Sequence, residues 1–552
     1  MPHIFDIENN RFKIILYFTF YDVLKRSRGK AILIPKGYIA PDDLPIEDLK
    51  RKLDRIGFPY VYINSGSFII NSGLFSYVPL FFYVDHEGRN VYVADEIYTL
   101  LQIMKNRKDK ALNSLCLNSL NKLAESEFIV FGYTLGDKTL IEKDIKILEA
   151  GKNLLFNDDE LKIKTEFIYY SPQKIKDEKS LEELLLNAIK DVFRDILSWS
   201  RSRKIIVPLS SGYDSRFIAT MLYLMNYKNV CTITYGLPNT EEPIAKKIAE
   251  RLGFEHIFIE YSPHTFSKLL PELPAYLLQY SQLFRTPNIQ ELLSTMLIRN
   301  LYNIDGIFIP GHTGDFISGG HLTIRALSRK NIYEISNSII EFHSLIRPFF
   351  IPQLVRLSLE RYLHNIWKEV KLFSAQLKPQ IQPYELQEIF DWRERQYKYI
   401  SSAIIPYIVY EYQFITPLWD KRLVNIFLKL TPKLKYKQKF YISFLFRNMF
   451  EPLEIDFRKY GEPSFLITHC EQILSRLPKI IQRYYSSLRA KVSEVSYKNY
   501  PQNPCGFDSF FPKLIKFCAN TTVDKHITRA KSPVYYLSIT TLFEIRKKHH
   551  EK

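Results

Sequence analysis

Short apolar runs separated by polar turns dominate the first third of the chain. Runs rich in β-branched and aromatic residues, with turn residues between them, predict β-strands. These runs lie at residues 32–34, 60–63, 67–70, 80–84 and 91–94. The last two flank the polar, glycine-containing stretch 85–90, which predicts a hairpin loop. We therefore expect residues 1–170 to form a β-rich domain.

The pattern changes to a helical period near residue 180. Apolar residues at positions 181, 185, 189, 192, 193 and 196 predict a helix from Leu181 to Trp199. Strand and helix patterns then alternate, with strands at 205–207, 232–236, 256–259 and 306–309 and helices at 217–225 and 241–252. This alternation favours an α/β fold with a doubly wound parallel sheet. We expect residues 171–180 to be a linker and 181–552 a second domain, mostly helical beyond Tyr333.

Composition narrows the class of protein. The chain has 552 residues, of which 46% are hydrophobic, so it can bury the cores of more than one domain. No apolar run approaches the roughly 18 residues that span a bilayer, and the N-terminus lacks the basic start and apolar stretch of a signal peptide. The five cysteines are odd in number and lack CxxC spacing. We expect a cytoplasmic, reduced protein with no membrane span and no structural zinc.

A formal net charge of +17 raises nucleic acid as a partner. The basic residues are nevertheless spread through several separate segments, and no sequence signature of a nucleic-acid-binding fold accompanies them. We expect this charge to lie on a solvated surface or to attract an anionic substrate, and we expect no specific nucleic-acid binding.

The strongest chemical signal is the stretch Leu209 to Arg216, which reads L-S-S-G-Y-D-S-R between a strand pattern and a helical one. A small-residue loop at a helix N-terminus favours phosphate, because backbone N–H groups and the helix dipole face the anion. It is not a Walker A loop, since no Lys follows the last Gly, and it is not a GxGxxG turn. The alternative interpretation is an ordinary polar turn capped by Asp214 or Ser215.

This stretch resembles the PP-loop of ATP pyrophosphatases, S-G-G-x-D-S, as found in asparagine synthetases, with Ser211 in place of the first Gly. Further segments carry the same resemblance in the same order; they cover residues 232–259, 306–320, 416–423 and 458–461. Segment 306–320 is similar to the family's S-G-(E/D)-G-x-D-E-x-F-G-G run, and 458–461 to its lysine segment. The resemblance implies a synthetase domain of the adenine nucleotide alpha hydrolase type.

The resemblance implies ATP and Mg²⁺ as cofactors and assigns individual residues. The residues expected at the nucleotide are Leu209, Ser210, Ser211, Gly212, Asp214, Ser215, Tyr235, Pro310 and Gly311. Among them Ser210, Gly212 and Ser215 would cradle the pyrophosphate. Asp214 and Asp315 would hold Mg²⁺. Lys459 would stabilise charge in the transition states of adenylation and amine attack; its alternative interpretation is a solvated lysine.

The N-terminal part resembles the glutamine amidotransferase domain of the same family. Residues 73–83 with 94–101, and 131–140 with 147–151, are similar to its strands and its exit segment. Family members that hydrolyse glutamine use an N-terminal Cys, whereas this chain begins Met1-Pro2 and its nearest cysteine is Cys116. The resemblance therefore implies a degenerate amidohydrolase-like (Ntn) domain without glutaminase activity.

Three positions depart from the family pattern. His312 stands where the family has a carboxylate, and it would act as a general base or reshape the acceptor pocket. Phe316 replaces a Glu, which we expect to add aromatic surface at the acceptor. Arg216 replaces a small residue and would be either a phosphate contact or a charge on the helix surface.

Two functions remain open at this point. The first is an ATP-dependent amide ligase that forms AMP and pyrophosphate, acting on aspartate or on another carboxylate such as a uronic acid or a peptide side chain. The second is a noncatalytic nucleotide-binding or regulatory relative. For the ligase, the expected partners are a small-molecule or saccharide carboxylate and ammonia or an amine; a separate glutaminase and a second copy of the chain, in a homodimer, are further candidates.

Overall fold

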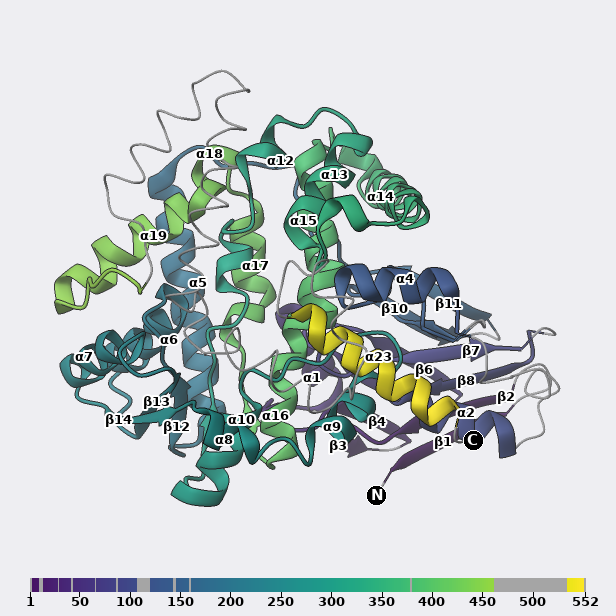
Figure 1. The fold of residues 1–552 in the computed structure, drawn as a ribbon, viewed down its shortest axis with the longest axis horizontal. Coiled ribbons are helices and arrows are strands. Elements are labelled where there is room, and N and C mark those ends of the chain that lie inside the picture. Colours follow the sequence, from purple (N-terminus) through teal and green to yellow (C-terminus); the bar gives the residue numbers. More distant parts are fainter. Residues whose placement is uncertain are drawn as a thin grey trace.

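The computed structural model describes residues 2–8, 13–27, 29–40, 43–64, 66–85, 88–106, 120–141, 145–157, 160–377, 380–460 and 534–550. Within these residues the chain forms two sheets in its N-terminal part and a parallel sheet with surrounding helices in its C-terminal part (Figure 1). The expected mixed α/β class, β-rich first and parallel later, is confirmed.

The two N-terminal sheets have the orders β1-β2-β8-β7-β9 and β11-β10-β6-β5-β4-β3. Their strands are His3–Glu8 (β1), Lys13–Phe18 (β2), Tyr21–Ser27 (β3), Lys30–Pro35 (β4), Tyr60–Asn64 (β5), Ser67–Asn71 (β6), Phe81–Val84 (β7), Asn90–Ala94 (β8), Lys146–Ile147 (β9), Lys152–Asn157 (β10) and Glu160–Thr165 (β11). All five strands expected from the apolar runs are present, and β7 pairs with β8 in antiparallel fashion as the hairpin pattern predicts.

Alternating side chains place the first sheet between two cores. Ile14 and Leu16 of β2 share a core with Leu33 of β4, whereas Ile15 faces the opposite side. That second core includes residues of helices Ile97–Asn106 (α2) and Lys122–Phe131 (α4). Helix Ile46–Ile56 (α1) contacts β3 and β4. The C-terminal helix Val534–His550 (α23) contacts α4 and lies across this part of the molecule in Figure 1.

The C-terminal sheet is parallel throughout, in the order β14-β13-β12-β15-β16. Its strands are Ile205–Pro208 (β12), Val230–Gly236 (β13), Glu255–Glu260 (β14), Ile307–Phe308 (β15) and Gln413–Phe414 (β16). The chain moves outward from β12 to β13 and β14, and then returns to place β15 on the other side of β12. Ligands of open parallel sheets bind outside the carboxyl ends of the strands at such a reversal. This topology therefore predicts a ligand site at the loops that follow β12 and β15.

Helices surround this sheet and fill the rest of the C-terminal part. The predicted helix from Leu181 to Trp199 is present as Glu178–Ser200 (α5), and Tyr213–Leu224 (α6) and Glu242–Leu252 (α7) follow β12 and β13. The remaining α-helices are Pro263–Ser267 (α8), Leu273–Ser281 (α9), Leu292–Leu297 (α10), Gly314–Ile317 (α11), Ile324–Ser328 (α12), Ile332–His343 (α13), Gln353–Phe373 (α14), Pro383–Phe390 (α15), Ile405–Val409 (α16), Lys421–Leu428 (α17), Pro432–Lys435 (α18) and Lys439–Leu445 (α19).

Shorter helical turns join these helices. The π-helical turns are Ile298–Tyr302, Asp391–Tyr399 and Phe446–Phe450, and the 3₁₀ turns are Pro348–Phe350, Ala375–Leu377, Ile400–Ile404, Pro417–Trp419, Tyr436–Gln438 and Glu451–Leu453. Residues 383–409 thus form one continuous helical segment whose middle is π-helical. No helix in the described ranges is long and apolar enough to cross a membrane.

Candidate functional site

The loop between β12 and α6 is held in shape by its own serines. The Ser210 hydroxyl accepts the Gly212 N–H at 3.0 Å and lies 3.0 Å from the Ser215 hydroxyl, which in turn accepts the Ser210 N–H at 3.0 Å. Helix α6 begins after Gly212 with no side-chain cap. The alternative of a turn capped by Asp214 or Ser215 is therefore wrong. A helix start without a side-chain cap suits an anion, because the helix dipole places partial positive charge there.

The loop after β15 approaches this helix start closely. A Cβ on Gly311 would lie 2.7 Å from the Ser215 backbone nitrogen, and a Cβ on Gly314 would overlap the Asp214 carboxylate. Only glycine permits these two approaches. From segment 416–423, the Trp419 indole donates a hydrogen bond to the Thr313 hydroxyl at 2.9 Å. Segments that resemble the family in sequence thus meet in space.

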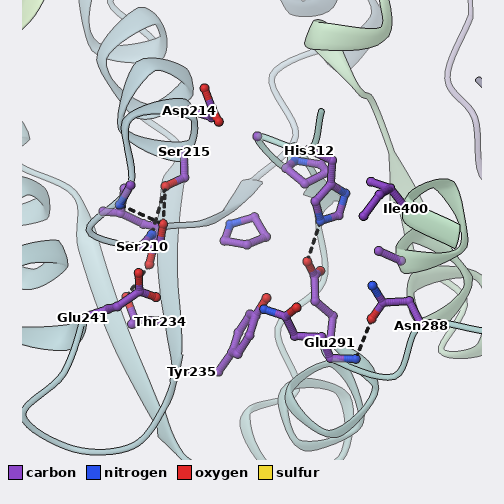
Figure 2. Close-up of a pocket in the computed structure, with 17 residues that line it drawn as sticks. Ser210, Asp214, Ser215, Thr234, Tyr235, Glu241, Asn288, Glu291, His312 and Ile400 are labelled. Atoms are coloured by element: carbon purple, nitrogen blue, oxygen red, sulfur yellow. Dashed lines mark hydrogen bonds and ion pairs between the residues drawn. The ribbon is translucent and has the colours of Figure 1, made fainter. Parts of the chain in front are cut away.

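A cavity of about 370 Å³ opens between the two loops. Most of the residues expected at the nucleotide line it, together with His312; they are Leu209, Ser210, Gly212, Asp214, Ser215, Tyr235, Pro310, Gly311 and His312. Figure 2 shows Ser210, Asp214 and Ser215 on one side of the cavity and His312, Glu291 and Ile400 on the other. Ser211, Asp315 and Lys459 are not among the lining residues.

The surroundings of Asp214 disfavour the charged form of its carboxyl group. Its Oδ1 is buried and makes no hydrogen bond to any described residue. Burial, followed by repulsion from Asp315, raises the pKa of Asp214.

Asp315 is held from outside the cavity by a histidine. His321 Nε2 lies 3.0 Å from Asp315 Oδ2, and His321 Nδ1 lies 2.6 Å from Asp391 Oδ2. Partial loss of solvation opposes the charge of Asp315, whose side chain is 53% exposed, but the neighbouring His321 outweighs this effect and lowers the pKa of Asp315. Among the described residues no group of three or more His, Cys, Asp or Glu side chains is arranged for a metal ion. Asp214 and Asp315 are neighbours, as expected, without forming an all-protein cage.

Lys459 stands at the edge of the same site. Its ammonium lies 5.5 Å from the centroid of the Tyr213 ring, at the first residue of α6. Burial raises the pKa of Glu241, which lines the cavity, and the charge of Lys459 acts against that shift. Lys459 is exposed to solvent, yet its neighbour Tyr460 donates its N–H to the Ser211 hydroxyl at 2.9 Å. Gly461, the last residue of this matching segment, lies outside the described residues.

The far side of the cavity contains a buried glutamate that the sequence did not reveal. Glu291 is 4% exposed; its Oε1 lies 2.8 Å from His312 Nε2 and its other oxygen accepts the Tyr407 hydroxyl. A different segment of the chain thus supplies a carboxylate beside His312. Glu291 precedes α10 within no recognisable motif, so only the fold brings it to His312.

Two further expectations from the sequence are wrong. Phe316 is 1% exposed, packs on Tyr169 with ring centroids 4.8 Å apart, and does not line the cavity. The short helix α11 turns this side chain into the core while Asp315 faces outward. Arg216 is neither a phosphate contact nor a surface charge: it is fully buried and donates to the backbone carbonyls of Ser211, Ile455 and Phe457.

Comparison with known proteins adds one finding. Residues 188–399 match the family model described as asparagine synthase. The match spans the β12–α6 loop, the β15 loop with His312 and Asp315, Glu291 and the start of the helical segment 383–409. It does not extend to the N-terminal sheets or to Lys459. No curated protein matches the chain.

Proposed function

We propose that the chain is an ATP-dependent ligase that joins a carboxylate to an amine or ammonia through an acyl-adenylate, because residues 188–399 match the asparagine synthase family model. A carboxylate oxygen attacks the α-phosphorus of ATP and expels pyrophosphate. The amine then attacks the acyl carbon, forming the amide and releasing AMP. The observation that carries the proposal is the uncapped start of α6, which faces a cavity at the reversal point of the parallel sheet.

The phosphate side of the cavity suits the leaving pyrophosphate. Ser210 and Ser215 place their hydroxyls there, and the hydrogen bonds among Ser210, Gly212 and Ser215 fix the loop before a ligand arrives. Donors that are already in place stabilise developing charge without reorganisation. For the adenosine we assign Leu209, Tyr235, Pro310 and Gly311, all of which line the cavity. Tyr235 is held by stacking on Tyr261, with centroids 5.4 Å apart.

Mg²⁺ fits the residues that are present. Oδ1 of Asp214 is buried and makes no hydrogen bond within the described ranges, and the pKa of this carboxyl is raised by burial and by Asp315. A divalent cation beside these two carboxylates would remove the repulsion between them. Mg²⁺ usually takes one or two protein carboxylates and completes its shell with phosphates and water, so two suffice. When bound, it would neutralise charge on the pyrophosphate.

The opposite side of the cavity suits the attacking amine. We assign His312 as the base that removes the proton from the amine, with Glu291 holding the ring by its Nε2. The Tyr407 hydroxyl fixes Glu291 in turn. A carboxylate behind an imidazole orients it and stabilises its protonated form. Lys459, at the mouth of the site, would stabilise charge in adenylation and in amine attack.

For the N-terminal part we propose a degenerate amidotransferase-like domain that leaves nitrogen supply to ammonia or to an amine substrate. The sequence has a single cysteine in residues 1–170, Cys116, and it lies outside the described residues. A thiolate nucleophile next to its own α-amino group is the feature that glutamine hydrolysis requires. The resemblance of this part to the family's amidotransferase strands supports a structural role for it.

Exchange of labelled pyrophosphate into ATP tests the proposed function. We expect exchange that depends on one carboxylate among a panel of aspartate, uronic acids and peptide carboxylates. Exchange requires adenylation but not amine attack, so it reads the first half-reaction alone. Nucleotide binding with no exchange for any acid of the panel would instead favour the noncatalytic relative.

A further inference from the structure

Two positions of the phosphate loop depart from the PP-loop pattern, and both contact the same distant segment. Ser211 replaces a glycine and Arg216 a small residue. Residues 455–460, more than two hundred positions later, receive or donate hydrogen bonds at both of them. That segment carries Lys459. Because both residues contact the segment that contains Lys459, we ask whether they position it together.

Arg216 donates hydrogen bonds from both terminal nitrogens of its guanidinium group. One terminal nitrogen donates to the carbonyls of Ile455 at 2.9 Å and Phe457 at 2.6 Å, and the other donates to the Ser211 carbonyl at 2.7 Å. The side chain is fully buried, with its guanidinium 5.1 Å from the centroid of the Phe450 ring. Burying a cation is costly unless its donors are satisfied. All three acceptors are backbone carbonyls, so Arg216 fixes the position of the backbone and does not neutralise a side-chain charge.

Ser211 provides a second fastening one turn away. Its hydroxyl accepts the Tyr460 N–H at 2.9 Å and donates to Glu241 Oε1 at 3.0 Å. Glu241 lines the cavity, so this hydroxyl links the wall of the site to the residue that follows Lys459. A glycine at position 211 would offer neither interaction. Ser211, which departs from the glycine of the motif, therefore adds hydrogen bonds to Tyr460 and Glu241.

We propose that Arg216 and Ser211 are positioning residues that fasten residues 455–460 to the phosphate loop, so that the Lys459 ammonium stands beside the start of α6 before nucleotide binds. The fastening lies on both sides of Lys459, at Phe457 and at Tyr460. The lysine side chain itself is exposed, and its ammonium lies 5.5 Å from the centroid of the Tyr213 ring. The catalytic part of the inference rests on the proposed function of Lys459; the fastening does not.

Hydrogen exchange on the full-length protein tests the fastening without any turnover. Ser211→Ala removes the hydrogen bond from the Tyr460 N–H together with the one to Glu241, so we expect amide exchange in residues 455–460 to rise about tenfold. Arg216→Met keeps the apolar stem and removes every donor, and we expect a larger rise. The matched control is Arg251→Met, which breaks only the exposed pair between Arg251 and Glu454 at 2.7 Å, and we expect wild-type exchange there. Unchanged exchange in Ser211→Ala, which does not disturb the core, would overturn the proposal.

A double-mutant cycle tests whether the fastening acts through Lys459. We expect Ser211→Ala to lower kcat in the presence of Lys459 and to have no further effect in the Lys459→Met background. If the double variant instead lowers kcat by the product of the two single effects, Ser211 acts independently of Lys459, and the positioning role is overturned. If exchange rises in Ser211→Ala but wild-type protein forms no amide with any acceptor, the fastening stands and the proposed function fails.

Discussion

The two sides of the cavity are built in different ways. The phosphate side comes from one contiguous stretch, Leu209 to Ser215, whose serines bond to each other. The opposite side is assembled from three segments far apart in sequence, which supply Glu291, His312 and Tyr407. The conformation of a contiguous loop depends mainly on its own residues. A cluster whose residues come from separate segments forms only when the whole domain has folded. The geometry of the first side therefore follows from a local pattern, whereas that of the second depends on how the whole chain folds.

The same difference should separate the kinetic effects of substitutions. Changes on the phosphate side should abolish both half-reactions, because adenylation comes first. Changes on the acceptor side should spare adenylation and impair amide formation. The following predictions test this division from the largest expected effect to the smallest.

Asp214→Asn and Asp315→Asn should each lower carboxylate-dependent pyrophosphate exchange by at least about a hundredfold, the scale of losing one electrostatic contact to developing charge. The reason is loss of the carboxylate oxygens that suit Mg²⁺. Asp305→Asn, at an exposed acid just before β15, is the matched control and should retain exchange. Near-wild-type exchange in either test variant would remove that residue from the proposed cation site.

The difference in stability between Asp214→Asn and wild type should depend on pH in a defined direction, because only the wild type has the Asp214 carboxyl. Burial and Asp315 raise the pKa of Asp214 to about 7, above its unfolded value. The folded protein therefore binds the extra proton between about pH 4 and pH 7, and its stability falls as pH rises through this window. Measured without Mg²⁺, the Tm of the Asn variant relative to wild type should be higher at pH 8 than at pH 4.5. An equal difference at both pH values would contradict the buried-pair account.

Glu291→Gln should lower amide formation about a hundredfold while leaving pyrophosphate exchange within a few-fold of wild type. The amide keeps the size of the side chain and removes the charge that stabilises a protonated His312. Quenched-flow measurement of amide product beside the exchange assay separates the two steps. Equal loss in both assays would mean that Glu291 serves adenylation or folding rather than amine attack.

Gly314→Ala should destabilise the protein by about 1–3 kcal/mol, because a methyl group at this position overlaps the Asp214 carboxylate. Chemical unfolding measures this loss. We also expect exchange to fall, since Asp214 must move to make room. A variant with unchanged stability would show that the two loops are farther apart than the structure has them.

The last prediction is that no glutaminase activity is present. The purified protein should release glutamate from glutamine no faster than a Cys116→Ala variant does. The reason is that the single cysteine of residues 1–170, Cys116, follows Leu115 in the chain and so has no free α-amino group to activate its thiol. A glutamate-release assay on homogeneous protein reads it. Release that persists in wild type and disappears in the Cys116 variant would refute the degenerate-domain proposal.

The sequence predicted the fold class and the phosphate side because both depend on local pattern. The helix from Leu181 and the alternation of strands and helices after it follow from periodicity, and the loop at Ser210 follows from its residue types. Glu291 escaped notice because a lone acid before a helix has no distinguishing neighbours. Phe316 and Arg216 were misassigned for a related reason: which face of a short helix is buried depends on what packs against it. The contacts of Arg216 join positions 216 and 455, and no local pattern encodes such a pairing.

Transfer of ¹⁸O from the carboxylate substrate tests the central claim most directly. In the proposed reaction a carboxylate oxygen attacks the α-phosphorus, and this oxygen leaves with AMP when the amine displaces it. With a carboxylate labelled in both oxygens, we predict that each amide formed is accompanied by one AMP carrying a single ¹⁸O, detected by mass spectrometry. Label that appears in inorganic phosphate together with ADP, or AMP without label, would contradict activation of the carboxylate as an acyl-adenylate at this site.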